Sequence, residues 1–326
     1  MKRFFDYHPN VLSYFKQVDQ RLNQNQSPKI IPAVEKSIVH PLINIKAVLW
    51  DVYGTLLGVD VGDLERSCLI RQPIEATAVT VINEFSLEQS LRLLYPNMPP
   101  AIALSSRYLE LIAESHRRSQ AQGVEYPEVV IEEIWKTILL QCQQVGYRPD
   151  ESEPVLDTAF RMAYFFDVAL QRNYLYKGIE KVLLALKNAG IRQGVISNAQ
   201  FYTPWQMRRL LRKQLGRRDL ELDEFFEEPL MLFSYELGYS KPNPGAFVRA
   251  INILKRQGIG AEEILYVGND MLNDVWGAWR HGMKTVLFAV DQAQTVWRQE
   301  DERCRDLAAD GVVNRTAQII ELILGG

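Results

Sequence analysis

The chain has 326 residues, enough for two domains or for one domain with a large insertion. Hydrophobic residues make up 47% of it and charged residues 24%, as in ordinary globular proteins. The net charge is −3, and short basic stretches such as residues 208–213 are typical of solvated helix faces. Composition therefore argues against a nucleic-acid-binding protein and favours a globular protein with a small-molecule substrate.

The sequence lacks the targeting signals and the residue spacings that are typical of several other classes of protein. Neither a signal peptide nor an apolar run long enough to span a membrane is visible. Cys68, Cys142 and Cys304 are far apart and lack Cys-x-x-Cys spacing, which predicts free thiols in a reducing compartment, the cytoplasm. The four histidines show no zinc-binding spacing, and no Gly-x-Ser-x-Gly segment exists, so neither a zinc nor a serine hydrolase is indicated.

Residues 1–44 are predicted to form an N-terminal extension. Residues 10–22 have helical periodicity, and the polar turn formers of residues 23–28 end it. Two interpretations stay open: an amphipathic helix that packs on the core or on another subunit of a homo-oligomer, and a partly disordered tail. The extension carries no recognisable chemistry.

Residues 59–175 are predicted to form a helical insertion. Apolar residues recur at intervals of three and four in four segments, which are residues 74–94, 102–118, 129–145 and 154–169. Helices with such apolar stripes bury them against one another, so the four segments predict a small bundle. The aromatic residues of this region, Trp135 among them, are expected in the bundle core.

Residues 45–58 and 176–326 are predicted to form an α/β core. Strands are expected at residues 45–50, 191–196, 230–233, 264–267 and 285–288, and helices at residues 178–188, 204–215, 244–255 and 271–281. This alternation predicts a doubly wound, Rossmann-like parallel sheet with right-handed crossovers. The loops that follow the strands then meet at one edge of the sheet.

The first of these strands ends in Asp51-Val52-Tyr53-Gly54-Thr55-Leu56. An Asp at the carboxyl end of a buried parallel strand lies where open α/β sheets place their chemistry. Gly54 allows a sharp turn, and Thr55 offers a hydroxyl beside the carboxylate. By itself the hexapeptide is equally typical of an Asp-led turn.

Three later segments also place polar residues at strand ends or in a stiff loop. They contribute Ser197 and Asn198, Lys241 between prolines, and Asn269, Asp270 and Asp274. In order and spacing, the four segments resemble the signature motifs of the haloacid dehalogenase superfamily, whose phosphatases and dehalogenases use an Asp nucleophile. The resemblance spans residues 45–288 and implies that the insertion is a helical cap over the active site.

The acidic residues predict a divalent cation. Asp51, Asp270 and Asp274 would gather three carboxylates around one cation, Lys241, and like charges so close cannot all stay ionised without compensation. Mg²⁺ fits best, because it takes one or two carboxylates together with waters and substrate oxygens.

The expected metal ligands are Asp51, the carbonyl of Tyr53, and Asp270, directly or through water. By the resemblance, Asp270 with Asp274 matches the last motif. Asn269 in the position of the first acid is an open alternative, and Asp274 also fits a carboxylate in the first turn of a helix.

The resemblance implies that Asp51 attacks phosphorus and forms an aspartyl-phosphate that water hydrolyses. Lys241 would offset the repulsion between carboxylate and phosphate. Thr55, Ser197 and Asn198 are the further expected contacts of the phosphoryl group.

Tyr53 departs from the phosphatase pattern, which has a second Asp there to protonate the leaving oxygen. Tyr at this position is similar to the metal-free 2-haloacid dehalogenases, and a phenol with a pKa near ~10 is a poor acid at neutral pH. The prediction is a Mg²⁺-dependent phosphatase acting on a small phosphomonoester. The alternatives are a 2-haloacid dehalogenase that forms an ester on Asp51, and a catalytically weak binding or regulatory protein.

Overall fold

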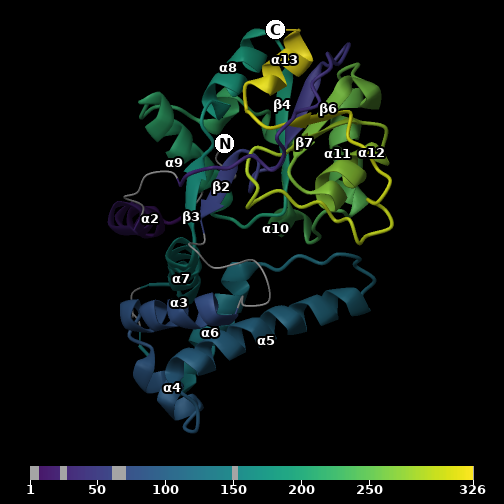
Figure 1. Cartoon of the computed structure of the whole chain (residues 1–326). Helices are drawn as coiled ribbons and strands as arrows, with labels where there is room; N and C mark the ends of the chain where they lie inside the picture. Colours follow the sequence, from purple (N-terminus) through teal and green to yellow (C-terminus); the bar gives the residue numbers. More distant parts are fainter. Residues whose placement is uncertain (1–6, 23–27, 61–70, 149–152, 326) are drawn as a thin grey trace. The chain divides into compact units, whose positions relative to one another are not determined.

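A computed structural model describes residues 7–22, 28–60, 71–148 and 153–325 (Figure 1). Cys68 lies outside these residues. By contacts, the described chain divides into unit 1, residues 28–59 and 173–325, and unit 2, residues 7–22, 60, 71–148 and 153–172. The boundaries proposed from sequence at residues 44, 58 and 175 stay a prediction.

Unit 1 is built on a six-stranded sheet in which all neighbouring strands are parallel. In spatial order the strands are β5 (Met231–Phe233), β4 (Arg192–Ser197), β1 (Ala47–Trp50), β6 (Ile264–Gly268), β7 (Lys284–Phe288) and β8 (Gly311–Val313). The predicted α/β class with a doubly wound parallel sheet is thus confirmed. The edge strand β8 was not predicted, because three residues are too short to show a pattern.

The helices of unit 1 cover the sheet (Figure 1). They are α8 (Ile179–Asn188), α9 (Thr203–Leu215), α10 (Ser234–Leu237), α11 (Pro244–Lys255), α12 (Gly277–Trp279) and α13 (Gln318–Leu324), with 3₁₀ turns η1 (Leu222–Glu224), η2 (Glu228–Leu230) and η3 (Ala261–Glu263). The predicted helix at residues 271–281 is instead a π-helical segment, η4 (Met271–Trp276), followed by the short α12.

Strand β1 lies at the centre of the sheet and is buried on both faces. Ala47 and Leu49 pack in one apolar cluster with residues of α11, whereas Trp50 donates a hydrogen bond to Gln193, which in turn donates to the carbonyl of Leu183 in α8. Successive side chains of a strand point to opposite faces of the sheet. The sequence of a strand that is covered by helices on both faces is therefore a continuous run of apolar residues.

The neighbours of β1 are β4 and β6, so three strands deliver their polar termini to one place. Asp51 follows β1, Ser197 ends β4 and Asn269 follows β6. Sheets of this type bind ligands at the carboxyl ends of strands where the strand order reverses. The site is therefore expected at this edge.

A second, two-stranded sheet pairs β2 (Leu57–Asp60) with β3 (Arg172–Leu175), neither of which was predicted. The two strands approach closely at Gly58, where a Cβ atom would lie 2.1 Å from the ring of Tyr174. Only glycine fits at this position without displacement of the ring.

Unit 2 is helical in the residues described. Its helices are α2 (Pro9–Leu22), α3 (Arg71–Glu84), α4 (Glu88–Leu94), α5 (Pro100–Ala121), α6 (Ile131–Gln144) and α7 (Val155–Leu170). The single helix predicted at residues 74–94 is wrong: Ser86 takes a left-handed φ of 54°, which separates α3 from α4. None of the described helices is both long and apolar enough to cross a membrane.

The predicted helical insertion does form a bundle with an aromatic core. The rings of Tyr108, Trp135 and Phe166 lie within 4.9 to 5.2 Å of one another, and Trp135 is fully buried. Helix α2 joins this bundle by packing on α7, where the ring of Phe15 lies 4.1 Å from that of Tyr164. Residues 9–22 are thus an ordered helix.

Candidate active site

Asp51 and Lys241 form the centre of the candidate site. The ammonium of Lys241 donates to Asp51 Oδ1 at 2.7 Å, to Asp274 Oδ1 at 2.5 Å and to the Tyr266 hydroxyl at 2.9 Å. All four side chains are buried. An ammonium has three N–H donors, and each of them has an acceptor here. The structure therefore brings together Asp51, Lys241 and Asp274, which lie up to 223 positions apart in the sequence.

Burial and charge determine the ionisation of this cluster. Burial alone would lower the pKa of Lys241, but the carboxylates of Asp274 and Asp51 outweigh it and raise that pKa above its ordinary value. Burial raises the pKa of Asp274; Lys241 opposes this change, and the charges of Asp51 and Asp270 add to it. Lys241 thus stays charged, while Asp274 is a weaker acid than an exposed Asp.

Two residues at the end of β4 hold this pair in place. Ser197 Oγ donates to Asp51 Oδ1 at 2.9 Å, the same oxygen that Lys241 contacts. The amide of Asn198 accepts from the backbone N–H of Lys241 at 2.6 Å and donates to its carbonyl at 3.2 Å. Asn198 therefore positions the Lys241 backbone, and its predicted contact with a phosphoryl group stays a prediction.

Asn269 lies against the loop that follows Asp51. Its Oδ1 accepts from the Thr55 hydroxyl at 3.3 Å, and a Cβ atom on Gly54 would lie 2.2 Å from its amide nitrogen. Gly54 also has a left-handed φ of 87°, so both backbone angle and space require glycine. The amide oxygen of Asn269 is thus held close to the turn that carries Asp51.

The side chain of Asp270 contacts Arg298 and the start of η4. Its carboxylate accepts from Nε and Nη2 of Arg298, the shortest contact being 2.7 Å, and caps η4 by accepting from the amides of Leu272 and Asn273. The backbone of Asp270 is extended, so its side chain points away from that of Asn269. Of the two open positions for the first acid, only Asn269 faces Thr55.

Tyr53 directs its hydroxyl toward helix α9. The phenol donates to Gln206 Oε1 at 2.8 Å and lies 2.8 Å from the hydroxyl of Thr203. An amide oxygen can only accept, so the phenolic proton is engaged with Gln206. In this arrangement the hydroxyl of Tyr53 is bound within the protein.

A magnesium ion at Asp51 would be held by oxygen donors of the kind that this ion prefers. Asp51, the carbonyl of Tyr53 and the amide of Asn269 supply hard oxygens, and Mg²⁺ commonly takes one or two carboxylates with several waters. The described residues contain no group of three or more His, Cys, Asp or Glu side chains arranged around a metal. A magnesium site here would therefore depend on one carboxylate and neutral oxygens.

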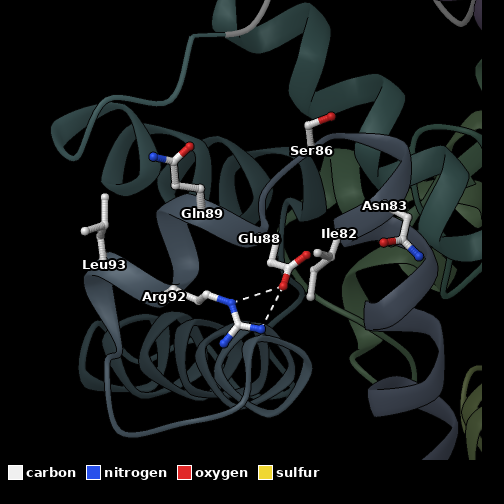
Figure 2. A pocket seen from close by; sticks show the side chains of 7 residues that line it. All are labelled: Ile82, Asn83, Ser86, Glu88, Gln89, Arg92 and Leu93. Carbon is white, nitrogen blue, oxygen red and sulfur yellow. Dashed lines mark hydrogen bonds and ion pairs between the residues drawn. The ribbon is translucent and has the colours of Figure 1, made fainter.

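A pocket of about 590 Å³ lies apart from these residues, in unit 2 (Figure 2). It is formed by the end of α3 and by α4, where Arg92 pairs with Glu88 one turn away. None of the residues predicted to carry chemistry lines it. Volume alone therefore does not locate the candidate site, which the charged cluster around Asp51 defines.

Three residues that contribute to the candidate site were not predicted from the sequence. Tyr266 lies within a buried strand and looked like an ordinary core residue, and Arg298 and Gln294 lie in an irregular segment without a motif. Only the general rule that a buried carboxylate needs a partner could have indicated that Asp270 has a cation such as Arg298.

Comparisons with known proteins place the chain in a family. The sequence pattern of the haloacid dehalogenase-like hydrolases matches residues 45–282, which include all four predicted motifs. Because this match covers more than half of the chain, the protein belongs to the haloacid dehalogenase-like hydrolase family.

Individual relatives carry phosphatase names. The glyceraldehyde 3-phosphate phosphatase of Pyrococcus furiosus is 33% identical over 146 residues, 45% of this chain and 53% of that protein. The protein of the same name from Methanopyrus kandleri is 27% identical over 267 residues, 82% of this chain and 93% of its own. The chain thus spans about half the length of the first relative and nearly all of the second.

Among solved structures, a 2-haloacid dehalogenase from Pseudomonas syringae pv. Tomato DC3000 is similar at 20% identity with a TM-score of 0.49. The match covers 85% of this chain and 97% of that one.

Removal of the central cation should destabilise the protein in a pH-dependent way. We expect Lys241→Met to lower the free energy of unfolding by about 3–5 kcal/mol near neutral pH, because it leaves two buried carboxylates unpaired. The folded-state pKa of Asp274 is raised, so protonation of this group favours the folded state at low pH, and that contribution is lost as pH rises through the folded pKa. Without Lys241 this pKa should rise further, so the variant should be least destabilised in acid.

Urea denaturation in EDTA from about pH 5 to about pH 8 measures this effect. Lys284→Met is the matched control, since the Lys284 ammonium is partly exposed where it pairs with Asp310, and its loss should cost at most about 1 kcal/mol. An equal loss of stability for Lys241→Met at both pH values would contradict the expectation.

Proposed function

We propose that this protein is a Mg²⁺-dependent phosphatase that hydrolyses a small phosphomonoester with Asp51 as nucleophile. The observation that carries the proposal is the arrangement of one carboxylate oxygen, Asp51 Oδ1, which accepts from Ser197 Oγ at 2.9 Å and from Lys241 Nζ at 2.7 Å. Such fixation at the end of a central strand orients the second oxygen of Asp51 for attack on an electrophile.

The reaction divides into two displacements at phosphorus. Asp51 Oδ2 forms a bond to phosphorus while the bond to the ester oxygen breaks, and the leaving alkoxide takes a proton from solvent or from a neighbouring group. Water then attacks the aspartyl-phosphate, which releases inorganic phosphate and regenerates Asp51. Lys241 reduces the repulsion between Asp51 and the phosphate dianion. A bound Mg²⁺ would add positive charge against the phosphoryl oxygens.

We infer that the magnesium ligands are Asp51, the Tyr53 carbonyl and Asn269, and that Asp270 is not among them. This assignment replaces our sequence-based expectation, because the carboxylate of Asp270 is bound by Arg298 and by the first amides of η4. Asp274 then acts by holding Lys241, at 2.5 Å, so its place among the ligands is also withdrawn.

The relatives named glyceraldehyde 3-phosphate phosphatase support a small phosphorylated substrate. Tyr53 favours the 2-haloacid dehalogenase alternative, because it stands where phosphatases of the family carry an acid. We also place the enzyme in the cytoplasm, since Cys142 and Cys304 are both free. Whether it assembles into a homo-oligomer stays a prediction.

Replacement of the nucleophile tests the proposal directly. We expect Asp51→Asn to reduce phosphate release from 4-nitrophenyl phosphate by at least about 10³-fold, because an amide cannot form the covalent intermediate. Phosphate and halide release from 4-nitrophenyl phosphate and 2-chloropropionate, with and without Mg²⁺, are compared in the wild type. Halide release without metal would move the dehalogenase alternative ahead, and no turnover of either would support a binding or regulatory protein.

The proposed metal ligands include Asn269 but not the adjacent Asp270, and variants of the two residues test this difference. We expect Asn269→Ala to weaken Mg²⁺ binding about 10–100-fold, because it removes an oxygen ligand that faces Thr55. Asp270→Asn should keep Mg²⁺ affinity within about threefold while it lowers the melting temperature, since it weakens the ion pair with Arg298. Calorimetric titration in the presence of inorganic phosphate measures both. The opposite ranking would return Asp270 to the metal site.

The engaged hydroxyl of Tyr53 predicts dependence on the leaving group. Without a strong general acid, aryl phosphates should be hydrolysed much faster than alkyl phosphates, since phenolate leaves without a proton. Tyr53→Asp should selectively raise the rate on alkyl phosphates, because a carboxyl group can be tuned to donate near neutral pH. Tyr53→Phe is the control and should leave the aryl-to-alkyl ratio unchanged. Equal wild-type rates on both ester types would mean that another group supplies the proton.

A further inference from the structure

A short turn after β7 contacts both the candidate site and the strands that leave unit 1. The turn covers residues 291–295 and is closed by the carbonyl of Asp291, which accepts from the amides of Gln294 and Thr295 and from the hydroxyl of Thr295. The side chains of Asp291, Gln294 and Thr295 are buried. Nothing in the reaction assigned to Asp51 uses these residues.

The turn forms hydrogen bonds with both strands of the two-stranded sheet. Asp291 Oδ2 accepts from the hydroxyls of Tyr174, in β3, and Tyr176, each at 3.0 Å. Gln294 Nε2 donates to the carbonyl of Val59, in β2, at 2.7 Å. Strand β2 begins at Leu57, directly after the loop that follows Asp51, and unit 2 begins at Asp60.

The same turn also orients Asn269. The backbone carbonyl of Gln294 accepts from Asn269 Nδ2 at 2.6 Å. A carbonyl can only accept, so the amide nitrogen of Asn269 must face Gln294. Its oxygen then faces Thr55, which donates to it at 3.3 Å. This hydrogen bond thus decides which atom of Asn269 is presented beside Asp51.

Gln294 therefore makes two short hydrogen bonds, one from its side chain and one to its backbone. The side chain donates to β2 and the backbone carbonyl accepts from Asn269, and the residue itself is buried. Because buried Gln294 is closely packed, a displacement that reaches its side chain through the hydrogen bond to Val59 is passed to its backbone. A rotation of the Asn269 amide would follow from loss of the Gln294 carbonyl as acceptor.

We propose that Gln294 is a positioning residue that couples the exit strand β2 to the orientation of the Asn269 amide. The position of the strand that leads to unit 2 then determines whether an oxygen is offered beside Asp51. The consequence for catalysis rests on the proposed function, in which this oxygen binds Mg²⁺. The coupling itself is a property of the protein without metal.

The metal-free protein tests the coupling first. The side-chain NH₂ signal of Asn269, assigned by its absence in Asn269→Ala, is followed by ¹⁵N NMR on the full chain. We expect Gln294→Met to shift this signal and to speed its exchange with water, because methionine keeps the bulk of glutamine but cannot donate to Val59. Thr316→Val is the matched control, since it removes a different buried hydrogen bond, to the carbonyl of Lys177, and should leave the signal unchanged. An unmoved Asn269 signal in Gln294→Met would overturn the proposal.

Mg²⁺ titration in the presence of inorganic phosphate tests the consequence. Gln294→Met should weaken Mg²⁺ binding about threefold to tenfold. This effect is smaller than the loss of affinity that is typical when a residue hydrogen-bonded to a metal ligand is removed. In an Asn269→Ala background the same change should have no further effect, which is the signature of coupled residues. Equal effects in both backgrounds would overturn the coupling. A wild type that binds no Mg²⁺ would overturn the proposed function instead. The coupling would then still be tested by the Asn269 side-chain signal in the metal-free protein.

Discussion

A buried ammonium organises the candidate site. Lys241 donates all three of its N–H groups to buried partners, which are Asp51 after β1, Tyr266 within β6 and Asp274 in η4. A buried charge is tolerated only when it is paired and hydrogen-bonded, so the Asp51 and Asp274 carboxylates and the lysine must be in place together. Asn198 contributes by binding both backbone groups of Lys241, which fixes the origin of its long side chain. The same contacts that make this cluster stable aim the carboxylate of Asp51.

The end of β6 shows how adjacent residues acquire separate tasks. Asp270 lies in extended backbone and its side chain contacts Arg298, whereas the side chain of Asn269 contacts Thr55. Arg298 itself takes a left-handed φ of 52°, a conformation that costs roughly 1–2 kcal/mol and that the bidentate pair with Asp270 helps to offset. Asn269 is thereby held by the carbonyl of Gln294 and Asp270 by Arg298, which favours a fixed position of the Asn269 amide next to the Asp51 loop.

Neutral groups stand at two positions where a phosphatase of this family would be expected to carry acids. In the proposed assignment, Asn269 offers an amide oxygen in place of a carboxylate, and Tyr53 carries a phenol that donates a hydrogen bond to Gln206. Both changes reduce the negative charge around Asp51. A less negative site binds a metal more weakly but repels an anionic substrate less, so the two substitutions are consistent with each other in electrostatic terms.

The sequence alone determined the parallel α/β core, the positions of its main strands along the chain and the residues expected at its carboxyl edge. These follow from local patterns: apolar runs of strand length, helical periodicity, and polar residues directly after a strand. The direction of each side chain was decided only by tertiary structure. Residues 269 and 270 both follow the same strand, and contacts distant in sequence distinguish them: Asn269 contacts Thr55 and Gln294, and Asp270 contacts Arg298. Likewise, Gln294 carries no motif and became significant because folding placed both β2 and Asn269 within hydrogen-bond distance of it. Hydrogen-bond partners distant in sequence are chosen by packing, which no local pattern records.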